Sequence, residues 1–304
     1  MENNPLVSII VITYNSSAFI LETLESIKTQ TYKNIELIIS DDSSTDKTIA
    51  LCSNWLKTNY IHFKNVKIIQ TPQNIGISGN CNHGLREASG EWIKYIAGDD
   101  MLTNNCIERF VEYAFIHTDS NFFSCDLEVF NDENHYYIQQ KGTRLNKKNS
   151  KQQLKYFIGC NSRINGPSLF INRTALIKLG GFNEEFPMVE DYPLYIKITS
   201  EGNIIRFIPE ILVRWRKNIN SVTHSGHGIF ITSISEFHEK ILLPLYKENH
   251  LLLLYYHYFI HYKILKKNIT MNIWLKRLIL SSDPVYIYNY VRYKFIMRTR
   301  KKLP

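Results

Sequence analysis

The chain has 304 residues, enough for one large domain with an appendage or for two domains. Hydrophobic residues make up 44% of it, which predicts a sizeable buried core and excludes a disordered chain. The five cysteines are scattered and form no CxxC pair, which favours a reducing compartment and argues against a structural zinc site. The longest apolar run, residues 251–262, is too short for a helix that crosses a membrane.

The net charge of +8 is unevenly distributed along the chain. Residues 226–304 contain thirteen Lys and Arg but only four Asp and Glu, so this region carries all of the net positive charge. The asymmetry predicts two parts, a near-neutral body over residues 1–225 and a basic, aromatic-rich helical region over residues 226–304.

The first hundred residues alternate between β-branched runs and segments with helical spacing of apolar residues. Strands are predicted at residues 7–12, 35–40, 66–70 and 92–97. Helices are predicted at residues 20–27, 48–55 and 82–88, and Ser16 or Ser17 is expected to cap the first of them. This alternation with short loops indicates an α/β fold with parallel strands and right-handed crossovers.

Three of the predicted strands end in polar side chains. Thr13 and Tyr14 follow the first strand, Asp42 follows the second, and Asp99 and Asp100 follow the fourth. Ligands of open α/β sheets bind beyond the carboxyl ends of the strands, so these residues predict a ligand crevice. These residue types together suit a nucleotide. The ring of Tyr14 can stack on a base, the carboxylate of Asp42 can accept from a base N–H, and the carboxylate of Asp100 can bind a metal that holds the phosphates. A solvated turn with a helix cap is the simpler alternative for the two adjacent acids.

The two commonest nucleotide-binding motifs are missing. The loop after the first predicted strand, residues 13–17, contains no glycine, although a dinucleotide-binding GxGxxG motif should begin there. A phosphate-binding P-loop is absent as well. The sequence therefore argues against a nicotinamide dehydrogenase and a P-loop NTPase.

Eight short motifs, in order, resemble those of family 2 glycosyltransferases. They are Ser8 to Asn15, Ser26 to Tyr32, Glu36 to Asp46, Asn74 to Gly76, Gly90 to Trp92, Gly98 to Asp100, Gly181 to Glu184, and Glu190 with Asp191. The resemblance covers roughly residues 5 to 225. It implies a GT-A fold, which is Rossmann-like with a mostly parallel central sheet and flanking helices, here with a helical C-terminal extension. It also implies transfer of a sugar from a nucleotide-sugar, usually with a divalent metal.

The resemblance assigns roles to individual residues. Those assigned to the nucleotide and its ribose are Thr13, Tyr14, Asn15, Asp42, Asn74, Gly76 and Asp99. Asp100 matches the carboxylate that binds Mn²⁺ or Mg²⁺, and Asp191 matches the catalytic base. From the residues alone, Glu190 and Asp191 read equally well as the start of a helix over residues 194–199.

Two positions depart from the family pattern. Members often carry an Arg where this chain has Cys81, and a His where it has Asn218. The missing Arg would contact the diphosphate, and Arg216, Lys217 or His224 are the candidates to replace it. Glu190 is a further candidate for diphosphate or acceptor contacts, and residues 161–170 are expected on the acceptor side by resemblance.

The basic C-terminal region has a pattern of its own. From residue 263 onward it has eleven Lys and Arg, one acid, and interleaved Tyr and Phe. Basic and aromatic residues together favour an anionic membrane surface. A packed helical appendage with a solvated basic face and an RNA-binding segment are the alternatives, although no RNA-binding module is recognisable and we expect no nucleic-acid partner.

These observations predict a metal-dependent inverting glycosyltransferase that moves a sugar from a UDP-sugar to a lipid-linked saccharide. We expect it to act in bacterial O-antigen or capsule synthesis, in the cytoplasm at the inner face of the membrane. The alternatives are a nucleotide-sugar-binding scaffold without activity and a sugar nucleotidyltransferase. The glycine-rich opening loop usual in nucleotidyltransferases is absent.

Overall fold

A computed structural model describes residues 4–130, 135–138, 141–160, 166–217, 228–249 and 251. The chain divides into two compact units, Met1–Ser233 and Ile234–Pro304. The boundary predicted from the charge distribution, between residues 225 and 226, lies outside the described residues.

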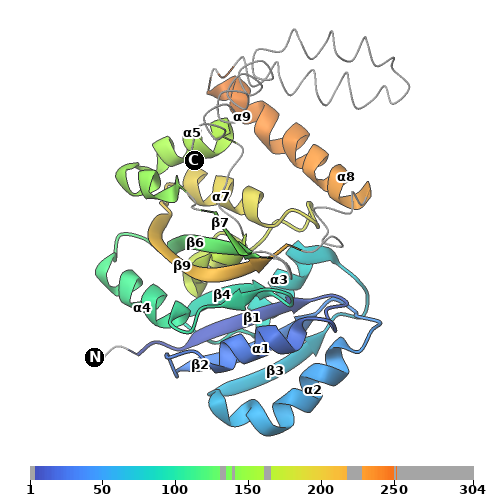
Figure 1. The fold of residues 1–304 in the computed structure, drawn as a ribbon. Coiled ribbons are helices and arrows are strands. Elements are labelled where there is room, and N and C mark those ends of the chain that lie inside the picture. The colour runs from blue at the N-terminus through green and yellow to red at the C-terminus, as the bar shows by residue number, and fades with distance from the viewer. Residues whose placement is uncertain are drawn as a thin grey trace, which may run out of the picture. The chain divides into compact units, whose positions relative to one another are not determined.

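One mixed sheet runs through the first unit (Figure 1). Its strands are β1 (Val7–Thr13), β2 (Ile35–Asp41), β3 (Asn65–Gln70), β4 (Trp92–Ala97), β5 (Met101–Leu102), β6 (Phe122–Phe130), β7 (His135–Ile138), β8 (Phe170–Asn172) and β9 (Arg206–Arg216). Their order is β3-β2-β1-β4-β8-β6-β9-β5, with β7 paired to β6. The four strands predicted from the sequence form the parallel half, β3 to β4, and their positions are confirmed.

Nine helices lie in the described residues, and the three predicted in the first hundred residues are among them, with two N-termini that differ from the prediction. They are α1 (Ile20–Lys28), α2 (Thr48–Asn59), α3 (Gly76–Glu87), α4 (Cys106–Ile116), α5 (Ser150–Cys160), α6 (Arg173–Lys178), α7 (Asp191–Ser200), α8 (Gly228–Phe237) and α9 (Leu243–Glu248), with short turns η1 (Tyr60–His62), η2 (Lys141–Lys147), η3 (Gly166–Ser168) and η4 (His238–Leu242). The predicted side-chain cap of α1 is wrong, because the backbone carbonyl of Ser16 accepts from Phe19 and Ile20 instead. Helix α3 begins at Gly76, well before the predicted start at Asn82.

Strands β1, β2 and β4 are buried on both faces, as their sequences predict, whereas the edge strand β3 is half-buried to exposed. Ile9 and Val11 of β1 belong to one core cluster with Leu24 of α1, Cys52 of α2 and Phe110 of α4. Helix α3 contacts β1 and β2, and α1, α2 and α4 share the core cluster on the sheet. Because the helices cover these strands, the polar side chains lie at the strand ends.

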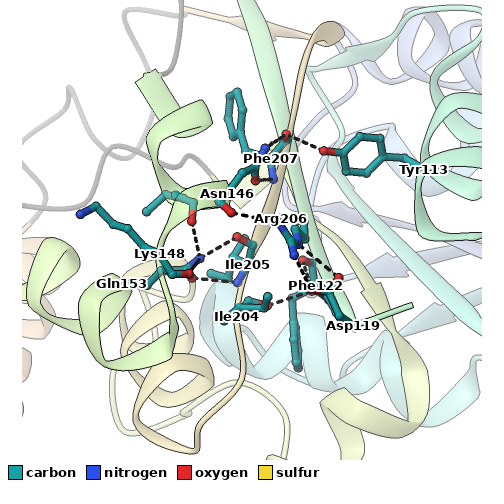
Figure 2. A network of polar contacts seen from close by, with 12 residues as sticks. Tyr113, Asp119, Phe122, Asn146, Lys148, Gln153, Ile204, Ile205, Arg206 and Phe207 are labelled. Atoms are coloured by element: carbon teal, nitrogen blue, oxygen red, sulfur yellow. Dashed lines mark hydrogen bonds and ion pairs between the residues drawn. The ribbon is translucent and has the colours of Figure 1, made fainter. Parts of the chain in front are cut away.

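Side-chain amides fasten η2 and α5 to the beginning of β9 (Figure 2). Gln153 donates its Nε2 to the carbonyl of Ile205 (3.0 Å) and accepts at Oε1 from the Ile205 N–H (2.8 Å). Asn146 makes the same pair of bonds with the backbone of Phe207, at 2.9 and 2.7 Å. These amides satisfy buried backbone groups much as a neighbouring strand would.

Helix α5 in turn supports α7. The Tyr192 hydroxyl donates to the carbonyl of Phe157 (2.9 Å), and the ring of Phe157 stacks on that of Tyr195 with centroids 5.7 Å apart. Because β9 holds α5 and α5 contacts α7, the N-terminus of α7 is fixed relative to the sheet. This matters for Asp191, which is the first residue of α7.

The described part of the second unit contains the end of α8, the π-helical turn η4 and α9. Phe237, Leu242 and Tyr246 are buried within it. Among the residues that the structure describes, no helix combines the length and apolarity needed to cross a membrane. The basic aromatic segment singled out in the sequence, from residue 263 onward, lies outside the described residues.

Candidate active site

The carboxyl ends of β2, β1 and β4 lie side by side in the sheet. Thr13 is opposite Asp41 in the β1–β2 register, and Ile12 is opposite Ala97 in the β1–β4 register. The structure therefore brings together the strand-end residues predicted to bind the nucleotide and the metal. The ring of Tyr14 is 51% exposed beside them, as a ring that stacks on a base would need to be.

Thr13 and Asn15 connect the loops at this edge. The Thr13 hydroxyl donates to Asp41 (2.7 Å), and the Thr13 carbonyl accepts from the Asp42 N–H (2.8 Å). The side-chain oxygen of Asn15 accepts from the N–H groups of Thr45 (2.9 Å) and Asp46 (3.3 Å). Both residues thus order the site, and their predicted contact with a nucleotide stays a prediction.

Asp42 is buried and organises the turn into α3. Its carboxylate accepts from the N–H groups of Ile75 (2.8 Å) and Gly76 (2.9 Å) and from the Thr71 hydroxyl (3.1 Å). Asn74 also accepts from the Gly76 N–H, at 3.2 Å. Gly76 has φ +81°, and a Cβ there would lie 2.7 Å from Pro187, so only glycine fits. Asp42, Asn74 and Gly76 therefore form one hydrogen-bonded unit, and their contact with a nucleotide stays a prediction.

Asp100 is 1% exposed at the end of β4, next to Asp99. Its Oδ1 accepts from the Arg216 N–H (2.9 Å), and its Oδ2 takes part in no hydrogen bond among the described residues. Burial raises the pKa of Asp100 well above its usual range, and the neighbouring Asp99 adds to the shift. A carboxylate oxygen without a partner, beside a second acid, fits a hard divalent cation that draws its other ligands from phosphates and water.

The described residues contain no cluster of three or more His, Cys, Asp or Glu suited to hold a metal by themselves. The donor set at the end of β4 is thus one carboxylate pair, Asp99 and Asp100.

Arg216 lies against this acid pair from β9. Its Nε donates to the Asp99 carbonyl (3.0 Å), and it forms an ion pair with Glu22 at 2.6 Å. The guanidinium also lies 4.5 Å from the ring centroids of Phe19 and Phe130. Arg216 is therefore close to the predicted metal ligand but already bonded, and its contact with a diphosphate stays a prediction. Lys217, the second named substitute, is exposed, and its backbone N–H donates to the Phe130 carbonyl (2.7 Å), so its contact with a diphosphate also stays a prediction. His224, the third, lies outside the described residues.

Asp191 and Glu190 form the second acidic group, at the N-terminus of α7. The N–H groups of Tyr192 (2.6 Å) and of Gly166 donate to Asp191. Burial raises the pKa of Asp191 to about 6, and burial together with the charge of Asp191 raises the pKa of Glu190 to about 8. A Cβ at Gly166 would lie 2.8 Å from Glu190 Oε1, so this close approach requires glycine.

The loop before α7 docks onto α3. Asn82 donates its Nδ2 to the Phe182 carbonyl (2.9 Å) and to Glu184 (2.8 Å), and its Oδ1 accepts from the Phe182 N–H (2.9 Å). The Ser78 N–H donates to the Pro187 carbonyl at 3.1 Å. These bonds give a physical reason for the motif Gly181 to Glu184, which connects the start of α7 to the helix that Asp42 holds.

Burial and two carboxylates raise the pKa of Cys81, which lies in α3. Burial raises the pKa of its thiol well above the usual value, followed in size by the charges of Glu190 and Asp42. The charges of Glu190 and of Asp42 thus both raise the pKa of this one thiol. Cys81 stands where family members often carry the diphosphate-binding Arg.

No specific role is predicted from the sequence for two residues that join the two sides, Asn82 and Gly166, although Gly166 lies in the segment 161–170 that is expected on the acceptor side. Each acts on a partner far along the chain, Asn82 on Phe182 and Gly166 on Glu190 and Asp191. No local periodicity or spacing signals such a contact. The motif Gly181 to Glu184 could have suggested a docking role, because it is polar and precedes a helix.

A model of glycosyl transferase family 2 matches residues 8–180, more than half of the chain. The chain belongs to this family. Among similar family members, a glucosyltransferase of Escherichia coli, WfaP, is 32% identical over 199 residues, covering 65% of this chain and 71% of WfaP. An uncharacterized glycosyltransferase of Haemophilus influenzae is 36% identical over 130 residues, which is 41% of this chain and half the length of that relative.

Two solved structures have a similar fold. TarS residues 1–349 of S. aureus, in complex with UDP-GlcNAc, superposes with a TM-score of 0.64 at 17% identity, covering 93% of this chain and 80% of that one. The mannosyltransferase PcManGT of Pyrobaculum calidifontis, in complex with GDP-Man and Mn²⁺, superposes with a TM-score of 0.61 at 18% identity. The match covers 92% of this chain and 75% of PcManGT. The fold of this glycosyltransferase is GT-A, as the resemblance implied.

Proposed function

We propose that this chain is a metal-dependent, inverting glycosyltransferase that moves a sugar from a UDP-sugar to a lipid-linked saccharide acceptor. The observation that supports it most is that the N-terminus of α3 contacts both Asp42 at the strand ends (2.9 Å from the Gly76 N–H) and the Pro187 carbonyl before α7 (3.1 Å from the Ser78 N–H), since an acidic pair lies at each of these two places. One is Asp99 and Asp100 at the strand ends, and the other is Glu190 and Asp191 at the start of α7. The Asp99 and Asp100 pair suits the binding of a cation with a diphosphate, and the Glu190 and Asp191 pair can accept a proton.

Asp191 serves as the general base. With a pKa of about 6 it is largely ionised near neutral pH, yet basic enough to take a proton from an alcohol as the new bond forms. The N–H groups of Tyr192 and Gly166 hold the carboxylate in place. The acceptor hydroxyl attacks the anomeric carbon from the face opposite the diphosphate, so an α-linked donor gives a β-linked product.

Donor binding falls to the strand ends. Tyr14 offers its exposed ring to the base, and Asp42 orients the N-terminus of α3. Mn²⁺ or Mg²⁺ at Asp100, when bound, would neutralise charge on the departing diphosphate. Arg216, fixed behind Asp99, adds positive charge on the same side.

The nature of the acceptor is proposed from the relatives. WfaP is named as an enzyme that transfers glucose from UDP-Glc to GlcNAc-diphosphoundecaprenol. A lipid-linked acceptor of this class would place the present chain in bacterial O-antigen or capsule synthesis, at the cytoplasmic face of the membrane. The PcManGT complex contains Mn²⁺ with its donor, which supports a divalent metal here.

The test is a panel of UDP-, GDP-, dTDP- and CMP-linked sugars, each incubated with the full chain with and without Mn²⁺. We expect thermal stabilisation and slow hydrolysis with a UDP-sugar, both of them dependent on the metal. Stabilisation without any turnover, with water or with added acceptors, would instead indicate a binding scaffold.

Replacing Asp100 by Ala should weaken the binding of UDP in the presence of Mn²⁺ by at least about tenfold, because a cation held by Asp100 would contribute several kcal/mol to binding the diphosphate. Isothermal titration with UDP, with Mn²⁺ and with EDTA, measures this effect. Glu87→Ala, which removes a surface ion pair with Lys67, is the control. Equal affinity of Asp100→Ala and wild type in Mn²⁺ would remove Asp100 from the metal site.

We also propose that the basic region from residue 263 onward docks on an anionic membrane surface. Its eleven basic residues and interleaved Tyr and Phe are the observation in favour. In flotation assays the full chain should rise with vesicles that contain about 30% anionic lipid and stay at the bottom with neutral vesicles, since each basic residue near the surface contributes about 1 kcal/mol. Flotation that is independent of anionic lipid would contradict the proposal.

A further inference from the structure

Lys94 is a lysine in the middle of the central strand β4, and its side chain is 0% exposed. Lysine is almost never fully buried unless it is paired, because removing an ammonium from water is costly. The proposed mechanism does not use this residue, so its burial requires an explanation.

Three carbonyl groups surround the ammonium. Lys94 Nζ donates to the carbonyls of Tyr95 (3.0 Å), Leu169 (3.3 Å) and Pro167. A protonated lysine has three N–H donors, so each finds an acceptor in the protein. Two of these carbonyls belong to η3 and the residue after it, so Lys94 fastens this segment to β4.

Three titratable groups affect the pKa of Lys94, and Asp100 is the carboxyl among them. Burial lowers the pKa of Lys94, while the charges of Cys106, Cys125 and Asp100 raise it. Burial raises the pKa of Cys106 to about 12 and that of Cys125 well above its usual value, so both thiols are neutral.

The segment that Lys94 holds leads directly to Asp191. Gly166 begins η3, its N–H donates to Asp191, and its backbone lies against Glu190. The Ser168 and Ser124 hydroxyls share a hydrogen bond of 2.8 Å that ties η3 to β6 as well. A continuous set of contacts thus runs from β4 through Lys94 and η3 to Asp191.

We propose that Lys94 is a positioning residue that holds η3, and through it Asp191, at a fixed place relative to Asp100 at the end of β4. The inference rests on the proposed function, because it concerns the base of that reaction. It adds a residue that contacts neither donor nor acceptor and acts only through the carbonyls of Pro167 and Leu169.

The test variant is Lys94→Met, which keeps the unbranched side chain and removes the ammonium. We expect kcat to fall about 10- to 100-fold, since a displacement of about 1 Å at a catalytic group can cost about 10²-fold. The Kd for UDP with Mn²⁺ should change less than about threefold, because Asp42 and Asp100 stay in place. Lys67→Met, at a partly exposed lysine of β3 that pairs with Glu87, is the matched control and should behave as wild type.

A double-mutant cycle distinguishes positioning from general damage. If Lys94 acts through Asp191, then Lys94→Met should cause no further loss of rate when Asp191→Asn is already present. The acid limb of the kcat profile should also move to higher pH in Lys94→Met, because Asp191 loses the N–H of Gly166 that lowers its pKa. The same fold loss in both backgrounds, with an unmoved acid limb, would overturn the proposal.

Folding is checked with a second variant, Lys94→Gln, whose amide can still donate to two carbonyls. If neither variant folds, Lys94 is a requirement of the fold and the positioning role is wrong. A wild-type chain that turns over no nucleotide-sugar would be a failure of the proposed function. An active wild type with an equally active Lys94→Met would be a failure of this inference alone.

Discussion

Replacing Asp191 by Asn should lower kcat about 10²- to 10⁴-fold, the usual contribution of a general base. The amide keeps the shape of the side chain but cannot accept the proton of the attacking hydroxyl. The Kd for UDP with Mn²⁺ should remain close to that of the wild type, since Asp191 lies on α7 and the nucleotide residues lie at the strand ends. Initial rates with the UDP-sugar from the panel and calorimetric titration measure the two quantities.

The control for this variant is Asp119→Asn, at an exposed acid that pairs with Arg206 (Figure 2). It should leave both quantities unchanged. A wild-type rate in Asp191→Asn would remove Asp191 from the role of base. Loss of UDP binding together with rate would show that Asp191 supports the site rather than the proton transfer.

The pH dependence of kcat should follow the two coupled carboxyls at the start of α7. Asp191 must be ionised to accept a proton, and its pKa is raised to about 6, so kcat should rise with pH around a midpoint near 6. Glu190, with its pKa raised to about 8, is protonated across that range. The first proton of the pair is thus lost from Asp191, and a second change in kcat should appear near pH 8, where Glu190 acquires its charge.

Glu190→Gln separates the two steps. The variant should keep the acid limb near pH 6 and lose the change near pH 8, because a neutral group already occupies this position at the lower pH. Profiles of kcat from pH 4.5 to 9.5 with saturating donor measure both limbs. An acid limb that stays near pH 4, as for an ordinary exposed carboxylate, would contradict the burial that the structure gives to Asp191.

The parallel half of the sheet was predictable because its signal is local. Residues 7–12 are almost continuously β-branched, and only a strand buried on both faces has that composition. The helix start at Gly76 was not predictable in this way. The segment 74–80 contains two glycines and two asparagines, a composition that is typical of a loop. It is helical here because Asp42 accepts from the first N–H groups of the turn.

The site was predictable only in part, for the same reason. Acids after parallel strands meet at one sheet edge by topology, which is why Asp42 and Asp100 could be grouped from the sequence. Asp191 precedes a helix, and acids are common there, so its assignment needed the family resemblance. Lys94 carries no local signal of its role, because its partners at residues 167–169 are distant in the chain.

In the proposed reaction, Asp100 and Asp191 act on opposite sides of one bound donor. Crystals of the full chain grown with UDP and Mn²⁺, with data collected at the manganese absorption edge, test it most directly. We predict an anomalous peak within coordination distance of Asp100, bridged to the diphosphate, with the Asp191 carboxylate facing the same nucleotide. Manganese bound away from Asp100, or a nucleotide that Asp191 does not face, would contradict the claim.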